Sequence, residues 1–361
     1  MSDARKVGIH GIGAFVPDQV RKNEWWPEDV VKSWTNRHVW DSERAEKTLA
    51  ALPTEGARMV MSAIAQHAGD PFQGAVERRV MPDGMSVSDM ELAASREAIS
   101  KADIDPGRIG VVLSNCLIPD HIGTVSACDL HHKLKLNPKC FSMTADAACN
   151  SFQMQLNIAE QMIRSGQADY ALLVQTSAIW RTNPPEESFS IHFGDGSTAV
   201  IIGPVEGEKG LMAQTHRTDG SVYKALVVTV NDGNWWDNGR VYTQSLDRTA
   251  MRNMFLKLAD FGKEVFEEAL EITKISPESI DFFACHQASV WFTSVAQQYL
   301  GMKNAKTVDT YSWAGTLSGA NLPLVLHTAE KEGLLKDGDL VAMYQGGTGM
   351  TYSATIMRWG K

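Results

Sequence analysis

The chain has 361 residues, of which 43% are hydrophobic and 21% charged, as in ordinary globular proteins. Its net charge of −9 argues against a surface devoted to nucleic acid, although a local basic patch remains compatible with it. Five cysteines without a CxxC pair predict neither a disulfide framework nor a zinc site, and no stretch is long and apolar enough to span a membrane.

The first residues, MSDARKVGIHGIGAFVP, lack the pattern of a secretory signal, so we expect a cytoplasmic protein with reduced cysteines. Residues 7 to 16 alternate small and apolar side chains as a buried strand does, and Pro17 ends the run. The GxG within this run is weak evidence for nucleotide binding, because a dinucleotide fingerprint needs a third glycine that opens a helix.

Residues 22 to 80 differ in character from the rest of the chain. They carry four tryptophans and many charges, and their pattern predicts two short helices. This segment is therefore interpreted as an insertion. A lid, a dimer arm and simple covering structure are all compatible with it.

A cysteine stands where a short apolar strand turns into a helix. After Cys149, apolar residues recur at helical spacing until Ser165 and Gly166 stop the pattern, which places Cys149 in the first turn of a buried helix. The unpaired N–H groups of a helix N-terminus favour a thiolate, so we expect a lowered pKa and a nucleophile. A buried structural cysteine is the alternative.

The remaining elements suggest an internal duplication. An amphipathic helix from about residue 89 and a buried strand at 109 to 116 have counterparts at 264 to 286. Ile104, Pro106 and Ile109 each recur 171 residues later, and the same offset places Asn115 opposite His286 and Cys149 opposite Ala320. Two halves of βαβ type that meet about a pseudo-twofold axis would bring Cys149 and His286 together.

Between the two copies, residues 168 to 178 and 197 to 205 are predicted to be central strands, joined by the turn HFGDGSTA at 192 to 199. Asp195 in this turn is interpreted as a turn-fixing carboxylate rather than a catalyst. His121, His131 and His132 lack a metal-binding spacing, and no metal site is expected.

The signature blocks of a known family are present in order: DAACNSF around Cys149, HFGDGSTAV at 192 to 200, HQAS at 286 to 289, GTLSGANLP at 315 to 323 and GGTGMTYSA at 346 to 354. They resemble those of ketoacyl-acyl carrier protein synthase III, of the thiolase superfamily. The resemblance covers residues 7 to 20 and roughly 77 to 361. It implies an α/β thiolase-like fold with two duplicated halves, 1–205 and 206–361, in five αβαβα layers.

The resemblance also implies an acyl-enzyme mechanism. Cys149 matches the family nucleophile, which takes an acyl group from coenzyme A or from a carrier-protein phosphopantetheine, and His286 matches the histidine that acts on the second substrate. The backbone N–H groups of Cys149 and Gly349 match the oxyanion hole. The thioesters are substrates, and no permanently bound cofactor is implied. A homodimer is implied as well.

The chain departs from the family where an asparagine normally assists malonyl decarboxylation: aligned through Pro323, that position is Thr316. A threonine hydroxyl is shorter than an amide, so decarboxylation is expected to weaken. Compensation by Asn321, five residues on, is an alternative, although on a helix Asn321 should lie on a different face. Gly123 aligns with an aromatic residue that closes the acyl pocket across the dimer, which predicts room for a bulkier acyl group.

Three functions are compatible with this pattern. The first is an acyltransferase of specialised metabolism that passes the acyl group from Cys149 to a second acceptor. The second is a decarboxylative β-ketoacyl synthase in which Thr316 suffices, and the third is a non-catalytic subunit of a condensing enzyme. Retention of Cys149 and His286 counts against the third.

Overall fold

Two sheets with the same strand order organise the chain. The computed structural model describes residues 5–35, 49–237 and 239–361. In the first sheet the order is β1 (Val7–Phe15), β7 (Gly196–Pro204), β6 (Tyr170–Ser177), β4 (Ile109–Leu117) and β5 (Phe141–Thr144). In the second it is β8 (Gly210–Thr218), β13 (Thr351–Arg358), β12 (Leu340–Gly347) and β11 (Phe282–Cys285).

The strand directions repeat as well as the order. β7 is antiparallel to both β1 and β6, while β4 is parallel to β6 and β5. In the second sheet β13 is likewise antiparallel to β8 and β12, and β11 is parallel to β12. A parallel bridge between Phe282 and Lys306 stands where β5 lies in the first sheet. The predicted duplication is therefore present in the fold.

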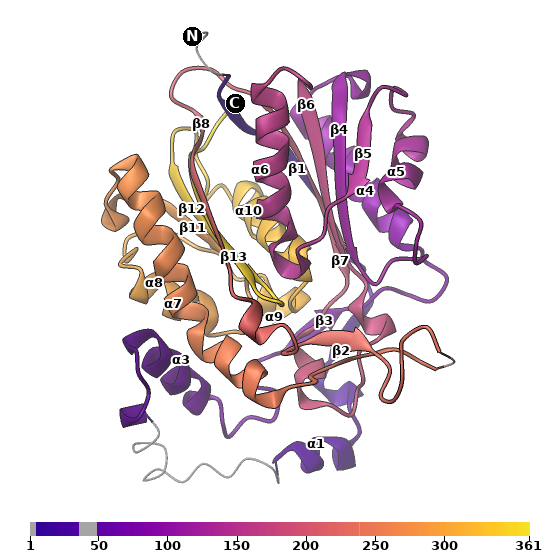
Figure 1. Ribbon diagram of the computed structural model, residues 1–361, viewed down its shortest axis with the longest axis vertical. Helices are drawn as coiled ribbons and strands as arrows, with labels where there is room; N and C mark the ends of the chain where they lie inside the picture. The colour runs from indigo at the N-terminus through magenta and orange to yellow at the C-terminus, as the bar shows by residue number, and fades with distance from the viewer. Residues whose placement is uncertain (1–4, 36–48, 238) are drawn as a thin grey trace.

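Helices complete five layers (Figure 1). α4 (Val87–Ala102) and α5 (Ser126–Leu134) cover the outer face of the first sheet, and α7 (Arg248–Thr273) and α8 (Phe292–Tyr299) cover that of the second. α6 (Ser151–Arg164) and α10 (Asn321–Lys331) lie between the sheets. This is the αβαβα arrangement of the thiolase-like fold.

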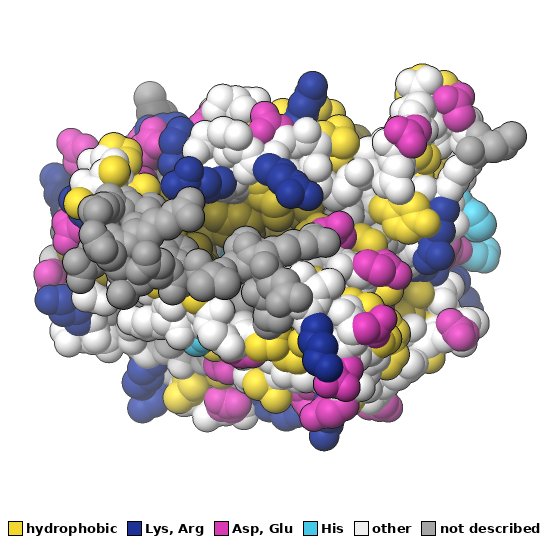
Figure 2. Space-filling model, turned by 90° about the horizontal axis from the view of Figure 1, so that it is seen from below, with side chains coloured by type: hydrophobic (Ala, Val, Ile, Leu, Met, Phe, Trp, Pro, Cys, Tyr) yellow, Lys and Arg dark blue, Asp and Glu magenta, His cyan; other side chains and the backbone are white. Residues whose placement is uncertain are grey.

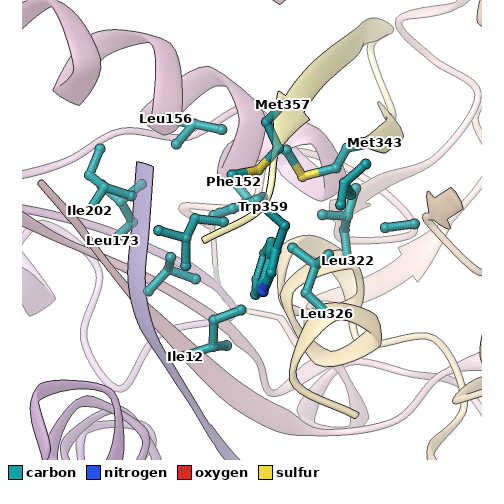
Figure 3. Close-up of a cluster of buried hydrophobic side chains, with 14 of the residues drawn as sticks. Ile12, Phe152, Leu156, Leu173, Ile202, Leu322, Leu326, Met343, Met357 and Trp359 are labelled. Carbon is teal, nitrogen blue, oxygen red and sulfur yellow. The ribbon is translucent and has the colours of Figure 1, made fainter. Parts of the chain in front are cut away.

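The central layer holds a large buried apolar cluster (Figure 3). Phe152 and Leu156 of α6 and Leu322 of α10 meet side chains of both sheets, such as Leu173 and Met343. All of these side chains are fully buried. Because α6 and α10 are clamped between two sheets, the turns that precede them are held in fixed positions.

The two halves match with a shift of one residue at these turns. A left-handed residue ends each outer helix, at Asp103 and Lys274, 171 residues apart. The short turns before the central helices, η3 (Ala148–Asn150) and η8 (Ser318–Ala320), begin only 170 residues apart. The expected match of Cys149 with Ala320 is therefore wrong by one residue, because the stretch from Lys274 to Ser318 is one residue shorter than that from Asp103 to Ala148, and Gly319 is the counterpart.

Packing explains the GxG of β1. A Cβ atom at Gly11 would lie 2.4 Å from the carbonyl oxygen of Ala98, and one at Gly13 would lie 2.1 Å from that of Ala94. Only glycine lets α4 approach this closely. These glycines therefore serve helix–strand packing.

The described part of the insertion covers one end of the molecule. It contains β2 (Val20–Lys22), α1 (Glu28–Thr35), α3 (Glu55–Gln66) and β3 (Glu77–Arg79), whereas Trp40 lies outside the described residues. The indole N–H of Trp26 donates to Ser190 Oγ (3.2 Å) and that of Trp34 to the carbonyl oxygen of Glu186 (2.7 Å). α3 packs on α7 and α8. These contacts favour covering structure.

The remaining short elements are η1 (Asn23–Trp25), η2 (Pro106–Arg108), η4 (Ile179–Arg181), η5 (Ser188–His192), η6 (Gly220–Val222), β9 (Val227–Thr229), β10 (Tyr242–Gln244), η7 (Pro277–Ser279) and α9 (Tyr311–Ala314). Within the described ranges, no helix has the length and apolar composition required to cross a bilayer. The division of the chain into halves 1–205 and 206–361 stays a prediction, favoured by the change of sheet between Pro204 and Gly210.

Candidate active site

Cys149 lies in the turn η3, between the edge strand β5 and the central helix α6. The helix begins at Ser151, so Cys149 precedes it rather than belonging to its first turn as expected. Ala148 adopts a left-handed backbone with φ of 51°, which rotates the following residue out of the helical path. Cys149 is half-buried and thus stays accessible to a substrate.

Three donors surround the Cys149 sulfur. Ser318 Oγ donates to it over 3.5 Å, and the backbone N–H groups of Cys149 and Thr348 also favour the thiolate. Burial nevertheless outweighs these donors, and the Asp146 carboxylate opposes ionisation too, so the pKa of the Cys149 thiol is raised above its usual value. The expected lowering of this pKa is therefore wrong: desolvation dominates over the helix N-terminus.

The end of β12 reaches directly to this turn. A Cβ atom at Gly347 would lie 2.3 Å from the carbonyl oxygen of Ala147 and 3.1 Å from the backbone nitrogen of Cys149. Only a residue without a side chain fits here, which explains one glycine of the loop that the sequence singled out. The loop after β12 thus brings Thr348 to the sulfur.

His286 arrives at the same strand end from the neighbouring strand. β11 runs parallel to β12 with Cys285 opposite Tyr344, and the next residue, His286, donates its backbone N–H to the Tyr344 carbonyl (2.8 Å). β11 therefore brings His286 beside β12, the strand whose last residue, Gly347, lies against the Cys149 turn, and the approach of the two side chains stays a prediction. Burial lowers the pKa of His286 to about 4, so its imidazole is neutral near pH 7.

Thr316 lies two residues before Ser318 and is held by its backbone. Its N–H donates to the carbonyl of His192 (2.7 Å), and its carbonyl accepts from the N–H of Gly194 (3.0 Å). Its hydroxyl is buried and has no hydrogen-bond partner among the described residues. Thr316 Oγ1 is therefore not committed to a structural bond.

Asn321, the first residue of α10, points toward His286. Its side-chain oxygen accepts the backbone N–H of Gln287, which follows His286, while its amide nitrogen is buried without a partner in the described structure. The side chain of Gln287 in turn bonds the backbone of Val308, Thr310 and Tyr311. Asn321 and Gln287 thus fix the backbone around His286.

No hydrogen bond joins two other expected site residues to the Cys149 sulfur in the described structure. Gly349 stands half-exposed between β12 and β13, next to Thr348, and its oxyanion role stays a prediction. Gly123 is exposed with φ of 89°, and a Cβ atom there would meet nothing within 4 Å. Asp195 accepts the N–H groups of Met81 (2.9 Å) and Trp180 (3.2 Å), which agrees with the expected turn-fixing role.

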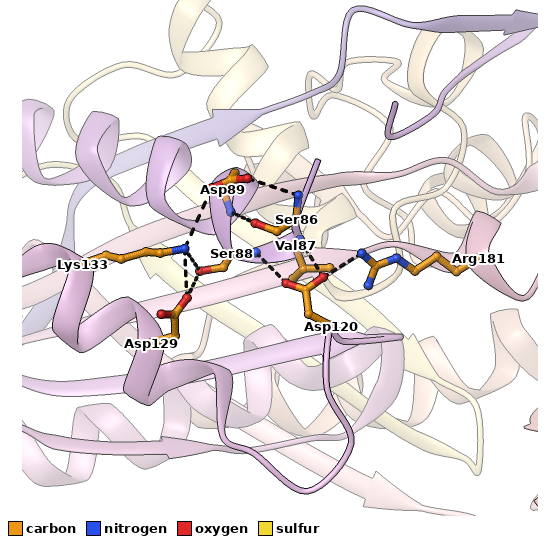
Figure 4. A network of polar contacts seen from close by, with 8 residues as sticks. All are labelled: Ser86, Val87, Ser88, Asp89, Asp120, Asp129, Lys133 and Arg181. Atoms are coloured by element: carbon orange, nitrogen blue, oxygen red, sulfur yellow. Dashed lines mark hydrogen bonds and ion pairs between the residues drawn. The ribbon is translucent and has the colours of Figure 1, made fainter. Parts of the chain in front are cut away.

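A polar network holds the loop after β4 (Figure 4). Asp120 accepts from the backbone N–H groups of Val87 and Ser88 at the start of α4, and it pairs with Arg181 at 2.7 Å. Behind this network, the Glu91 carboxyl is fully buried, and its burial raises its pKa to about 8. The network fixes the loop that carries Gly123.

The end of the molecule that the insertion covers has a hollowed surface. Figure 2 shows hydrophobic side chains within the hollow and Lys and Arg side chains along its margin. α7 begins at this end (Figure 1), where Arg248 and Arg252 are exposed and form no ion pair among the described residues.

The start of α7 is tied to the active-site loop. Lys257 Nζ lies 3.5 Å from Asp219 Oδ2, and Asp219 exchanges two backbone hydrogen bonds of 2.9 Å with Met350. Met350 is two residues from Thr348. The two arginines therefore lie on a helix that contacts the loop around the sulfur.

Known proteins resemble the chain over this site. Residues 143–220 match 3-oxoacyl-[acyl-carrier-protein] synthase III and residues 270–359 match the C-terminal part of that enzyme. A β-ketoacyl-[acyl-carrier-protein] synthase III of Bacillus pumilus is 30% identical over 359 residues, which cover 98% of this chain and 99% of the relative. The chain belongs to the 3-oxoacyl-[acyl-carrier-protein] synthase III family.

Solved structures agree with this membership. The synthase III of Aquifex aeolicus VF5 has 25% identity and a TM-score of 0.77, covering 98% of this chain and all of the other. OleA of Xanthomonas campestris, at 20% identity, has a TM-score of 0.77 with 99% of this chain and 97% of the other covered, which shows the shared fold. The synthase III family is one of acyl-transferring and condensing enzymes that use thioesters of coenzyme A and of acyl carrier protein.

Ser318 and Thr348 belong to two of the signature blocks, but sequence reasoning did not single them out as contributors to the site. Ser318 is near Thr316 in the chain, but its contact with Cys149 depends on how two halves of the molecule meet. The offset of the duplication was the available signal, since it places the turn around residue 319 opposite Cys149.

Proposed function

We propose that this chain is a synthase III-type acyltransferase. Cys149 attacks an acyl thioester of coenzyme A or of a carrier protein, holds the acyl group as a thioester and passes it to a second acceptor. The observation that carries the proposal is the surrounding of the Cys149 sulfur: a half-buried cysteine faced by three hydrogen-bond donors at the strand end where His286 lies. Covalent capture divides the transfer into two easier steps.

His286 is suited to move the proton. Its imidazole is neutral near pH 7, so it can accept the thiol proton of Cys149 and return it to the departing thiolate. The N–H groups of Cys149 and Gly349 are proposed to hold the developing oxyanion. Such a donor contributes about 3 kcal/mol in comparable sites.

The presence of Thr316 in place of the family's asparagine favours an acceptor other than a malonyl thioester. Its hydroxyl is buried and uncommitted, but it is shorter than the amide that assists decarboxylation in the family. The decarboxylating alternative would use the amide nitrogen of Asn321, which is buried without a partner in the described structure while its oxygen accepts from the backbone of Gln287; our proposal rests on the shorter Thr316 hydroxyl. We therefore place the enzyme in specialised metabolism, with transfer to a carbon, oxygen or nitrogen nucleophile.

Decarboxylative condensation is the second candidate. The relatives named β-ketoacyl-[acyl-carrier-protein] synthase III favour it, and it requires that the Thr316 hydroxyl suffice in place of the family's asparagine. A non-catalytic subunit is the third, and the half-buried Cys149, whose sulfur accepts a hydrogen bond from Ser318, argues against it.

Intact-protein mass spectrometry tests these candidates. The protein is incubated with a panel of acyl-coenzyme A thioesters, and malonyl-coenzyme A is then added. An acyl adduct on Cys149 that survives malonyl addition supports transfer to another acceptor. An adduct that clears with release of carbon dioxide establishes condensation instead, and absence of an adduct from both coenzyme A and carrier-protein donors contradicts catalysis.

A second copy of the chain is the proposed partner at β5. This strand is the last of its sheet, and Phe141 and Met143 are 48% and 36% exposed on it. An edge strand with exposed apolar side chains favours pairing with another strand. Met143→Lys is expected to convert a dimer into a monomer in light scattering, whereas a monomeric wild type contradicts the proposal.

A further inference from the structure

Ser318 makes a direct contact with the nucleophile. Its hydroxyl donates to the Cys149 sulfur over 3.5 Å, from a turn in the other half of the molecule. The residue is 2% exposed, so this hydroxyl is shielded from bulk water. A hydrogen bond in such surroundings favours an anionic acceptor more strongly than it would in water.

The position of Ser318 is enforced by its surroundings. Its backbone is left-handed, with φ of 52°, a conformation that only glycine adopts without cost. The turn is held by Gln345, whose side chain donates to the carbonyl of Gly319 (3.2 Å), and by Thr198, which donates to that of Ala320 (3.4 Å). A serine thus occupies a place where glycine would fit better, and its hydroxyl reaches the sulfur.

We propose that Ser318 is a catalytic residue whose hydroxyl stabilises the Cys149 thiolate as it attacks the thioester. The thiol proton moves to His286, a sulfur electron pair forms the bond to the acyl carbon, and the bond to the departing thiol breaks. His286 returns the proton to that thiolate. Ser318 keeps its own proton throughout, and only its hydrogen bond strengthens and weakens.

The other side chains described near the sulfur do not stabilise its thiolate in the resting site. Burial favours the neutral thiol, and the carboxylate of Asp146, which bonds Asn115 and the N–H of Ala148, opposes the thiolate. His286 is neutral near pH 7 and gains a positive charge only when it takes the thiol proton, so in the resting site it does not favour the thiolate. Among the groups that lower the pKa of the Cys149 thiol, the Ser318 hydroxyl has the largest effect, followed by the backbone N–H groups of Cys149 and Thr348.

The test measures the thiol itself. Full-length wild type, Ser318→Ala and Ser318→Gly are treated with iodoacetamide between pH 6 and 10, and alkylation of Cys149 is followed by peptide mass spectrometry. We expect the apparent pKa of Cys149 to rise by about one unit in both variants, which makes alkylation about tenfold slower below that pKa. A pH profile identical to the wild type in either folded variant overturns the proposal.

Two controls separate this effect from damage to the fold. Ser318→Gly removes the hydroxyl and relieves the left-handed backbone, so it should fold at least as well as the wild type. The exposed Cys128 serves as a reference within each molecule, because its alkylation should not change. Ser197→Ala removes another fully buried hydroxyl, bonded to Thr176, and should leave Cys149 alkylation unchanged.

The role of Ser318 in acyl transfer rests on the proposed function. Its effect on the alkylation of Cys149 does not depend on that function. A shifted alkylation profile without any acyl adduct would contradict the acyltransferase while keeping the role of Ser318 on the sulfur. An unshifted alkylation profile with normal acylation would contradict the role of Ser318 and keep the acyltransferase.

Discussion

Gly319 occupies in the second half of the molecule the position that Cys149 occupies in the first. Each follows a left-handed residue, Ala148 with φ of 51° or Ser318 with φ of 52°, and each leads into a central helix. The two turns touch through the bond from Ser318 to the Cys149 sulfur. One turn thus carries the nucleophile and the other supports it.

Gly319→Ala should destabilise the protein. A Cβ atom there would lie 2.9 Å from Gln175 Oε1, closer than real side chains approach, and 3.4 Å from the Ala148 carbonyl. We expect a loss of about 1 to 3 kcal/mol in the free energy of unfolding, measured by urea denaturation. Gly69→Ala, at an exposed site with nothing within 4 Å, is the control. Equal stability of the two variants would contradict the close contact of the turns.

Cys149→Ala should abolish acyl transfer while the protein stays folded. Removing the sulfur eliminates the covalent step and leaves a small side chain in a half-buried turn. Acyl adducts are measured by intact mass and turnover by thiol release. Cys128→Ala, at an exposed position, should behave like the wild type. Undiminished turnover of Cys149→Ala would contradict the acyl-enzyme mechanism.

Much of the fold could be predicted from the sequence because it rests on local patterns. The strands at 7 to 16 and 109 to 116 and the helix after Cys149 follow from their apolar spacing, and the structure has them as β1, β4 and α6. The duplication predicts a common location of Cys149 and His286, since equivalent strand ends meet in a two-fold arrangement; both residues adjoin β12, and their direct approach stays a prediction.

The electrostatics of the site were not predictable in the same way. The pattern around Cys149 shows a helix start, which favours a thiolate, but the sulfur is enclosed by residues distant in sequence, such as Ser318 and Thr348. Burial of the sulfur raises the pKa of the Cys149 thiol in spite of the hydrogen bonds from these two residues, which favour the thiolate. The one-residue shift between the two turns likewise depends on the number of residues between the outer helix and the turn in each half. The spacing of apolar residues within an element does not predict that number.

Arg248 and Arg252 should bind the anionic part of the acyl donor. Both are exposed and unpaired within the described structure, on the helix that contacts the active-site loop. For the double change to Glu, we expect kcat/KM to fall about tenfold at low salt, with a smaller effect at high salt. The double variant Lys331→Glu and Lys336→Glu changes the net charge by the same amount and is the control, which should leave kcat/KM unchanged. A fall that salt does not reduce would contradict an electrostatic role.

Glu97 should make stability depend on acid pH. Partial burial alone would raise the pKa of Glu97, but hydrogen bonds from His327, the Ala14 N–H and Lys101 outweigh it and lower this pKa to about 2. The folded pKa lies below the unfolded value of about 4.3, so this stabilisation is complete above pH 4.5 and is lost as the pH falls toward 2.

Thermal unfolding between pH 2 and 7 measures that loss. Glu97→Gln should lower the melting temperature near pH 7 and flatten its fall in acid, because the neutral amide no longer titrates. Glu28→Gln, in an exposed pair with Lys32, should leave the curve unchanged. Parallel curves for the wild type and Glu97→Gln would exclude a special contribution of Glu97.

Thr316→Asn should raise malonyl decarboxylation. The amide would add an N–H donor at a position where the Thr316 hydroxyl is buried and has no partner in the described structure. One oxyanion donor in an optimised site changes kcat by about 100-fold or more, so at least about a tenfold rise is expected from an unoptimised one. Release of carbon dioxide from labelled malonyl-coenzyme A measures it.

The matched control is Thr316→Val, which keeps the shape of the side chain and adds no donor. It should leave decarboxylation at or below the wild-type level, while acylation of Cys149 by the donor thioester continues in both variants. Because acylation and decarboxylation are measured separately, a damaged active site is distinguished from an altered one. If Thr316→Asn acylates normally but releases no more carbon dioxide than the wild type, position 316 does not decide between condensation and transfer.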